Sequence, residues 1–222
     1  MKKFAAKAAR PLPVIILADI SGSMEVDGKI DAMNQALKEL IDSFSKESRL
    51  NAEIHLSVIT FGNQKAEEHI PLTPAYQISG FNNFSAQGKT PMGKAFMLAR
   101  KLIEDKERIP SRAFRPVIVL VSDGHPNDEW ETEFQLLCES ERAQKATRMA
   151  MAIGSDANET MLKEFINDPE TPLFKANNAN DIKRFFRAVS MSVTTRSRST
   201  TPNQQQVITY EAIPDDELEL DF

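Results

Sequence analysis

The chain has 222 residues, of which 41% are hydrophobic and 27% are charged, the composition of a soluble globular protein with one substantial core. Its formal net charge of −5 gives no electrostatic reason to expect nucleic-acid binding. No apolar stretch approaches the roughly 18 residues that a membrane-spanning helix needs, so we expect no membrane span.

The first residues are basic and lead into an apolar run. Residues 2–10 contain four lysines or arginines and no acid, so we expect a solvated leader over residues 1–10, followed by one domain over residues 11–196. The run Val14–Ala18 is short for the apolar part of a signal peptide, and it predicts a buried strand.

A cluster of oxygen-bearing side chains directly follows this strand. Asp19, Ser21 and Ser23 supply one carboxylate and two hydroxyls, and Gly22 allows the chain to turn tightly between them. These are the hard oxygen ligands that Mg²⁺ prefers. The same residue types are common in ordinary turns, so this segment alone also fits a plain strand-to-helix loop.

The remaining elements alternate between helix and strand. Apolar spacing predicts helices over residues 28–46, 92–103, 134–138, 161–166 and 182–193, and strands over residues 54–61, 66–72, 116–122, 148–153 and 173–175. Strands separated by helices of this length need parallel crossovers and a sheet covered on both faces. We therefore expect an α/β fold with a doubly wound, mostly parallel central sheet and helices on both faces.

Two later loops offer further oxygen ligands. Gly88–Gly93 precedes a helix and contains the hydroxyl of Thr90, and the apolar strand after Pro116 ends at Asp123. Binding sites of open α/β sheets lie beyond the carboxyl ends of the strands, where Asp19 and Asp123 meet if their strands are neighbours. The three loops together predict a divalent-cation site.

These residues resemble the metal-ion-dependent adhesion site of the von Willebrand factor A domain family. The family order of Asp19-x-Ser21-x-Ser23, then Thr90, then Asp123 is complete. The resemblance implies that Ser21 and Ser23 contact the metal and that Thr90 binds it directly or through water. By the same resemblance, Asp19 and Asp123 act largely through water, and the metal is Mg²⁺ or alternatively Mn²⁺.

The resemblance covers roughly residues 11–195 and is greatest to bacterial tellurium-resistance-type proteins. It implies a metal-dependent protein-interaction module, not an enzyme, in which an Asp or Glu of a protein partner takes an open coordination position. Association with a protein kinase and a protein phosphatase is common in that group, which suggests a signalling or stress-response scaffold. The lone cysteine, Cys138, cannot form an internal disulfide, which suits a reducing compartment, so we expect a cytoplasmic protein. From the lack of a long apolar stretch and the charge balance, we also expect no membrane and no nucleic-acid partner.

The main alternative is a metal-dependent enzyme of phosphoryl transfer or hydrolysis. His125, directly after Asp123-Gly124, is the only obvious general base near the predicted metal. Gly88-Lys89-Thr90 is not a phosphate-binding P-loop, because Asn83 stands where that motif needs its first glycine. Trp130 lies on the same loop as His125 and fits either core packing or an exposed partner contact.

The C-terminal residues 197–222 have a distinct composition. They contain six acids and one base, which accounts for the whole net charge of −5, because residues 1–196 hold 26 basic and 26 acidic residues. We expect a disordered acidic tail. Its first part carries hydroxyl groups beside the basic residues Arg196 and Arg198, which predicts accessible phosphorylation sites at Ser197, Ser199, Thr200 and Thr201.

Overall fold

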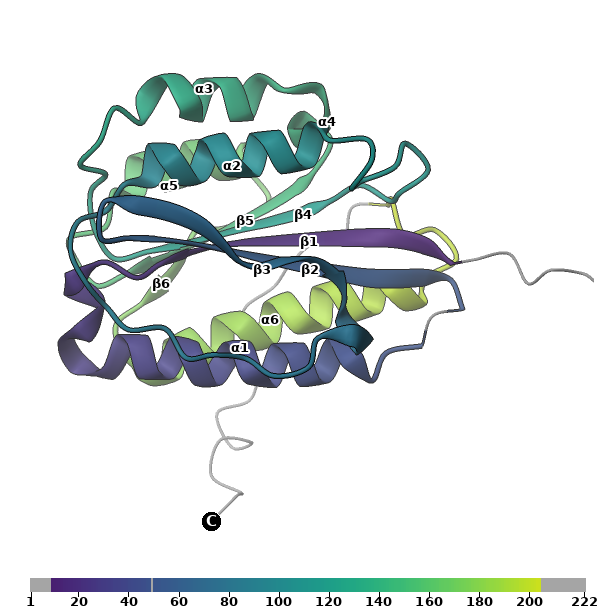
Figure 1. Ribbon diagram of the computed structural model, residues 1–222, viewed down its shortest axis with the longest axis horizontal. Helices are drawn as coiled ribbons and strands as arrows, with labels where there is room; N and C mark the ends of the chain where they lie inside the picture. The colour runs from purple at the N-terminus through teal and green to yellow at the C-terminus, as the bar shows by residue number, and fades with distance from the viewer. Residues whose placement is uncertain (1–8, 49, 205–222) are drawn as a thin grey trace, which may run out of the picture.

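The computed structural model describes residues 9–48 and 50–204. In this part of the chain a six-stranded sheet has the order β3-β2-β1-β4-β5-β6 (Figure 1). The strands are β1 (Arg10–Asp19), β2 (Ala52–Gly62), β3 (Lys65–Pro74), β4 (Val117–Ser122), β5 (Thr147–Ile153) and β6 (Phe174–Ala176). Every neighbouring pair is parallel except β2 and β3. The predicted doubly wound, mostly parallel α/β class is confirmed.

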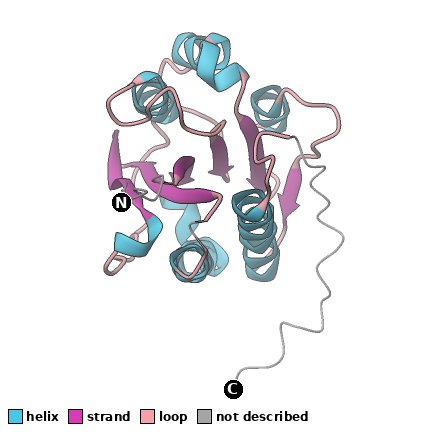
Figure 2. Cartoon of the chain, turned by 90° about the vertical axis from the view of Figure 1, so that its right-hand side faces the viewer, coloured by secondary structure: helices cyan, strands magenta, loops and turns pink. Residues whose placement is uncertain are grey.

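Helices cover both faces of the sheet (Figures 1 and 2). One face carries α1 (Lys29–Ser45) and α6 (Ala179–Arg198). The other face carries α2 (Met92–Glu104), α3 (Glu131–Glu139), α4 (Glu141–Gln144) and α5 (Glu159–Ile166). Two short 3-10 segments, η1 (Gly22–Gly28) and η2 (Ala75–Gln77), complete the described elements.

Strand β1 shows why the sheet needs both layers. Val14 and Ile16 belong to the core beneath α1 and α6, whereas Ile15 and Leu17 belong to the core on the opposite face. Successive side chains of a strand point to opposite faces, and all four are fully buried. Each such burial contributes about 1.5–3 kcal/mol, so the continuous apolar run fixes this strand at the centre of the molecule.

The β2–β3 hairpin forms the antiparallel edge of the sheet. Its two turn residues, Asn63 and Gln64, have φ angles of 46° and 66°, the left-handed region that a two-residue hairpin requires. Glycine usually occupies at least one of these two positions, so no hairpin is predicted from the sequence there. The strand predicted near residues 66–72 is present as the longer β3.

The last helix extends past the predicted domain boundary at residue 196. It ends at Arg198, and Ser197 is fully buried with its hydroxyl donating to the Thr194 carbonyl at 2.8 Å. The Arg196 Nε donates to the Pro202 carbonyl at 2.9 Å, so the following residues fold back onto the helix. Ser197 is therefore a structural residue and not an accessible phosphorylation site, because its hydroxyl lies inside the domain.

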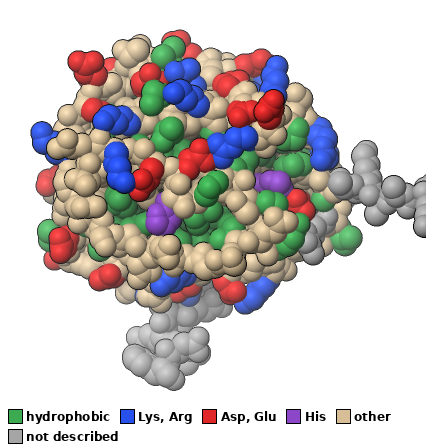
Figure 3. Space-filling view, in the orientation of Figure 1, with side chains coloured by type: hydrophobic (Ala, Val, Ile, Leu, Met, Phe, Trp, Pro, Cys, Tyr) green, Lys and Arg blue, Asp and Glu red, His purple; other side chains and the backbone are tan. Residues whose placement is uncertain are grey.

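Most of both predicted terminal segments lies outside the described residues, namely residues 1–8 of the leader and residues 205–222 of the acidic tail. Thr200 and Thr201 are described and exposed. None of the helices in the described part of the chain is long and apolar enough to cross a membrane. On the face shown in Figure 3, basic and acidic side chains are intermingled.

Candidate metal centre

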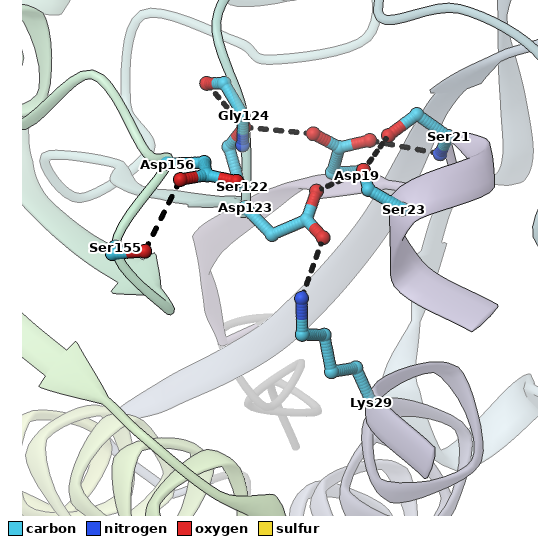
Figure 4. A network of polar contacts seen from close by, with 9 residues as sticks. All are labelled: Asp19, Ser21, Ser23, Lys29, Ser122, Asp123, Gly124, Ser155 and Asp156. Atoms are coloured by element: carbon cyan, nitrogen blue, oxygen red, sulfur yellow. Dashed lines mark hydrogen bonds and ion pairs between the residues drawn. The ribbon is translucent and has the colours of Figure 1, made fainter. Parts of the chain in front are cut away.

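Asp19 forms the buried base of the site. It is the last residue of β1 and is fully buried. Its Oδ1 accepts the Ser21 backbone N–H at 2.8 Å, and its Oδ2 accepts the Ser122 hydroxyl at 2.7 Å (Figure 4). These bonds fix the carboxylate between the ends of β1 and β4, which are neighbouring parallel strands.

A chain of hydroxyls joins the first loop to the second carboxylate (Figure 4). The Ser23 hydroxyl donates to Asp123 Oδ1 at 2.7 Å, and the Ser21 and Ser23 hydroxyl oxygens lie 3.1 Å apart. A hydroxyl has only one proton to donate. Ser23 therefore accepts from Ser21, and the two hydroxyls and Asp123 act as one connected group.

Thr90 is brought to the same place by the long loop before α2. It is buried, and its Oγ1 lies 4.0 Å from the position that a Cβ would take at Gly124, directly after Asp123. Its carbonyl accepts the Asn127 N–H at 3.2 Å. The structure thus brings together the three loops whose side chains the sequence predicted: Asp19, Ser21, Ser23, Thr90 and Asp123.

The loop that carries Thr90 is held by close backbone contacts. The Gly88 carbonyl accepts the Gly22 N–H at 3.0 Å, and the Gln87 N–H donates to the Ile20 carbonyl at 2.8 Å. Gly88 has a φ of 68°, and a Cβ there would lie 2.7 Å from the Asn63 Cα. Only glycine fits this position without moving the loop.

Asp128 links the loop after β4 to the start of α2. Its Oδ1 accepts the Gly93 N–H at 3.0 Å and its Oδ2 accepts the Lys94 N–H at 3.2 Å. A carboxylate in this place satisfies free N–H groups at a helix N-terminus and interacts favourably with the helix dipole. This role was not predicted from the sequence, because Asp128 lies 35 positions from the backbone it binds.

The two other residues singled out on this loop differ in exposure. His125 is exposed, and Trp130 is half-buried. The Trp130 ring packs edge-on against Phe134 with ring centroids 5.6 Å apart, and it borders the core on that face of the sheet. Core packing is therefore the observed role of Trp130.

Lys29 is a component of the site that the sequence did not reveal. Its Nζ lies 3.0 Å from Asp123 Oδ2, and the lysine side chain is only 20% exposed. Lys29 begins α1, and η1 brings it to Asp123 across 94 positions in the chain. The hydrogen bond from Ser122 to Asp19 was also not predicted from the sequence. A hydroxyl at the end of an apolar strand beside Asp123 could have indicated that Ser122 belongs to the site.

The electrostatics of the site favour a cation. The pKa of Asp19 is raised from 3.8 to about 6. Burial is the largest cause and repulsion from Asp123 adds to it, while hydrogen bonds from Ser21 and Ser122 oppose the shift. Lys29 is the one cation paired with these two carboxylates among the described residues. Two desolvated carboxylates and three hydroxyls beside a single ammonium group fit a divalent cation with hard-oxygen preference.

The donor set also indicates how such a cation would be held. The described residues contain no group of three or more His, Cys, Asp and Glu side chains that could hold a metal ion. A cation held by these side chains would therefore need hydroxyl oxygens for part of its coordination, and Ser21, Ser23 and Thr90 provide them.

Comparison with known proteins identifies the family. Residues 14–188 match the von Willebrand factor type A domain. This span covers most of the chain and includes all of the converging side chains. The chain therefore belongs to the von Willebrand factor type A domain family.

Solved structures with the same fold include proximal thread matrix protein 1 from the mussel byssus, with 20% sequence identity and a TM-score of 0.61 over 84% of this chain and 49% of that one. A second structure of that protein, with a zinc-occupied metal-ion-dependent adhesion site, is 19% identical with a TM-score of 0.61, over 84% and 48% of the two chains. The manganese-loaded TRAP protein of Plasmodium vivax is 20% identical with a TM-score of 0.51, over 79% and 71% of the two chains. At these identities the likeness shows the fold.

A relative with higher sequence identity is the uncharacterized protein Rv2850c of Mycobacterium tuberculosis, which is 32% identical over 114 residues. The match includes 50% of this chain and 17% of that protein. The chain thus spans about half of the mussel protein and a much smaller part of the mycobacterial one.

Proposed function

We propose that this protein is a divalent-cation-dependent protein-interaction module. The observation that carries this proposal is the convergence of the Ser21–Ser23–Asp123 chain with buried Asp19 and with Thr90. In this assignment the hydroxyls of Ser21 and Ser23 hold the ion, and Thr90 and the two carboxylates complete its surroundings. The ion would supply an electrophilic position to which a carboxylate of a partner can bind.

The arrangement of buried and exposed groups supports access from one side. Asp19 and Asp123 are buried, whereas Ser23 and His125 are exposed, so the open side of the centre is the side of these last two residues. Few direct carboxylate ligands leave a cation electrophilic toward an incoming Asp or Glu. Zinc in the mussel protein and manganese in the Plasmodium protein support a divalent cation. We assign Mg²⁺, with Mn²⁺ as the alternative.

The partner class and cellular role rest on the resemblance to tellurium-resistance-type proteins. We propose a protein partner that presents Asp or Glu, and a cytoplasmic signalling or stress-response scaffold that acts with a protein kinase and a protein phosphatase.

The lone Cys138 has its pKa raised mainly by burial, so it is a poor nucleophile and suits a structural role.

An enzyme of phosphoryl transfer or hydrolysis is the second candidate, and His125 is the feature that favours it. A general base must be oriented toward the reacting proton. No hydrogen bond in the described part of the chain holds the exposed His125 ring. We therefore favour binding over catalysis.

The test is calorimetric titration of Mg²⁺ into the full chain and two variants. Asp19→Ala should abolish binding, whereas Asp156→Ala should retain it. Asp156 is an exposed carboxylate of the loop after β5, and its Oδ1 accepts a hydrogen bond from the Ser155 hydroxyl at 3.1 Å (Figure 4). Partner capture should then require Mg²⁺, be lost with chelator, and be lost in Asp19→Ala. Equal Mg²⁺ affinity in both variants would refute the metal assignment.

A further inference from the structure

A polar cavity lies at the opposite end of the sheet from the metal centre. Its volume is about 350 Å³, and its lining comes from the segment before β4, the start of β5, and the ends of α5 and α6. Parallel strands begin at this end, which faces the viewer in Figure 2. The metal centre lies where the same strands finish, so the cavity is a separate site.

The cavity is lined by four cationic side chains and one carboxylate. The cations are Arg115, Lys145, Arg148 and Arg196, and the carboxylate is Asp168. Lys145 pairs with Glu141 at 2.6 Å, and Asp168 accepts hydrogen bonds from the Glu170 N–H and the Thr171 hydroxyl. The lining therefore carries a clear excess of positive charge.

Arg196 is buried, and no carboxylate of the described part of the chain pairs with it. It is 3% exposed, and its guanidinium donates to neutral oxygens only: the carbonyls of Pro202 and Arg115, both at 2.9 Å, and the Thr147 hydroxyl at 3.3 Å. Burial, together with a smaller contribution from repulsion by Arg115, lowers the pKa of Arg196 to about 10. These contacts orient the guanidinium, and no described carboxylate neutralises its charge.

Arg148 is a second buried arginine of the cavity lining. It is 5% exposed, its Nη1 contacts the Cys138 sulfur at 3.1 Å, and its guanidinium lies 5.8 Å from the centre of the Phe165 ring. No ion pair of Arg148 or Arg196 is found among residues 9–48 and 50–204. Burying a charge without a counter-ion is costly, so two such arginines at one cavity favour a bound anion.

We propose that this cavity binds a small phosphoryl anion such as phosphate or pyrophosphate. Guanidinium groups match the geometry of phosphate oxygens and can form paired hydrogen bonds with them. Among the described residues, the lining has no aromatic side chain on which a nucleobase could stack, and its neutral members are polar or aliphatic. The ligand is therefore recognised by its phosphoryl oxygens, and a nucleoside attached to them adds no affinity.

The experiment is calorimetric titration of the full chain with inorganic phosphate, pyrophosphate and AMP, with EDTA present and ionic strength held constant with NaCl. Phosphate and pyrophosphate should bind saturably at one site, and AMP should bind no more tightly than phosphate. Arg115→Gln removes an exposed cation of the lining and should weaken phosphate binding roughly tenfold. Arg112→Gln, an exposed arginine three positions away and outside the lining, should leave it unchanged.

Two further variants separate binding from folding and from the metal centre. Arg148→Gln removes a buried unpaired charge, so its Tm without phosphate should equal or exceed that of the original chain, while the rise in Tm with phosphate is lost. Asp19→Ala should retain phosphate binding, which distinguishes failure of this proposal from failure of the metal assignment. The proposal is overturned if phosphate raises Tm no more than NaCl does, if Arg115→Gln and Arg112→Gln bind phosphate equally, or if AMP binds more tightly than phosphate.

Discussion

Two features of Asp19 disfavour its charged form in the absence of a cation. It lies fully buried at the end of β1, and it faces a second carboxylate, Asp123, whose partner is Lys29. Hydrogen bonds from Ser21 and Ser122 compensate part of the cost of its charge. A bound cation would compensate the rest, so in the proposed function this residue would couple metal binding to stability.

The first prediction concerns the pH dependence of the metal-free protein. The folded-state pKa of Asp19 is about 6, above its ordinary value of 3.8, so the folded protein binds the extra proton between these values. The associated stability is present below pH 3.8 and is lost as pH rises through 6, at a cost of about 3 kcal/mol. Asp19→Asn stays neutral, so at pH 8 in EDTA it should be the more stable protein by a similar amount.

Urea unfolding at pH 4 and pH 8 measures this difference. The advantage of Asp19→Asn should be small at pH 4, where the folded-state carboxyl is already protonated. An advantage of equal size at both pH values would show that the substitution acts through packing instead of charge.

The second prediction concerns Lys29. Its ammonium group neutralises Asp123 and opposes a cation at the same carboxylate. Lys29→Gln should therefore raise Mg²⁺ affinity by roughly fivefold, the size expected for a partly exposed ion pair. Lys46→Gln removes an exposed lysine paired with Asp42 on the same helix and is the matched control. Weaker Mg²⁺ binding in Lys29→Gln would instead mean that the lysine is needed to position Asp123.

At the level of secondary-structure elements, the sequence predicted the central strands well and the loop contacts poorly. Val14–Ala18 and the strand before Asp123 are continuous apolar runs, because both faces of the sheet are buried, and such runs are visible without a structure. The contacts of Lys29 and Asp128 could not be predicted, since their partners are 94 and 35 positions away. Only the tertiary fold brings these groups together.

The third prediction tests the loop that carries Thr90. Gly88→Ala adds a Cβ at a φ of 68° and 2.7 Å from the Asn63 Cα, so the loop must move. We expect a loss of about 1–3 kcal/mol of stability and weaker Mg²⁺ binding. Gly80→Ala is a matched control, because Gly80 also has a positive φ, 87°, but its added Cβ meets nothing within 4 Å.

Urea unfolding and Mg²⁺ titration of both variants measure the effect. The strain from positive φ is common to the two glycines, so the difference between them reports the close approach to Asn63. Identical Mg²⁺ affinities in the two variants would show that this loop does not shape the metal centre.

At the scale of the whole molecule, the sheet separates two chemically different ends. The carboxyl ends of β1 and β4 carry the carboxylates and hydroxyls, and the amino ends of β4 and β5 carry the arginine-lined cavity. Basic and acidic side chains are intermingled on the face shown in Figure 3, in keeping with the balance of 26 basic and 26 acidic residues before residue 197. Neither sign of charge therefore dominates that face.

The most direct measurement is an anomalous difference map from a crystal of the full chain soaked in Mn²⁺. We predict one strong peak within bonding distance of the Ser21 and Ser23 hydroxyls, close to Thr90 and bordered by Asp19 and Asp123. The same map from Asp19→Ala should lack that peak. A strong peak elsewhere with none beside these hydroxyls, or an unchanged peak in the variant, would contradict the assignment of this site as the metal centre.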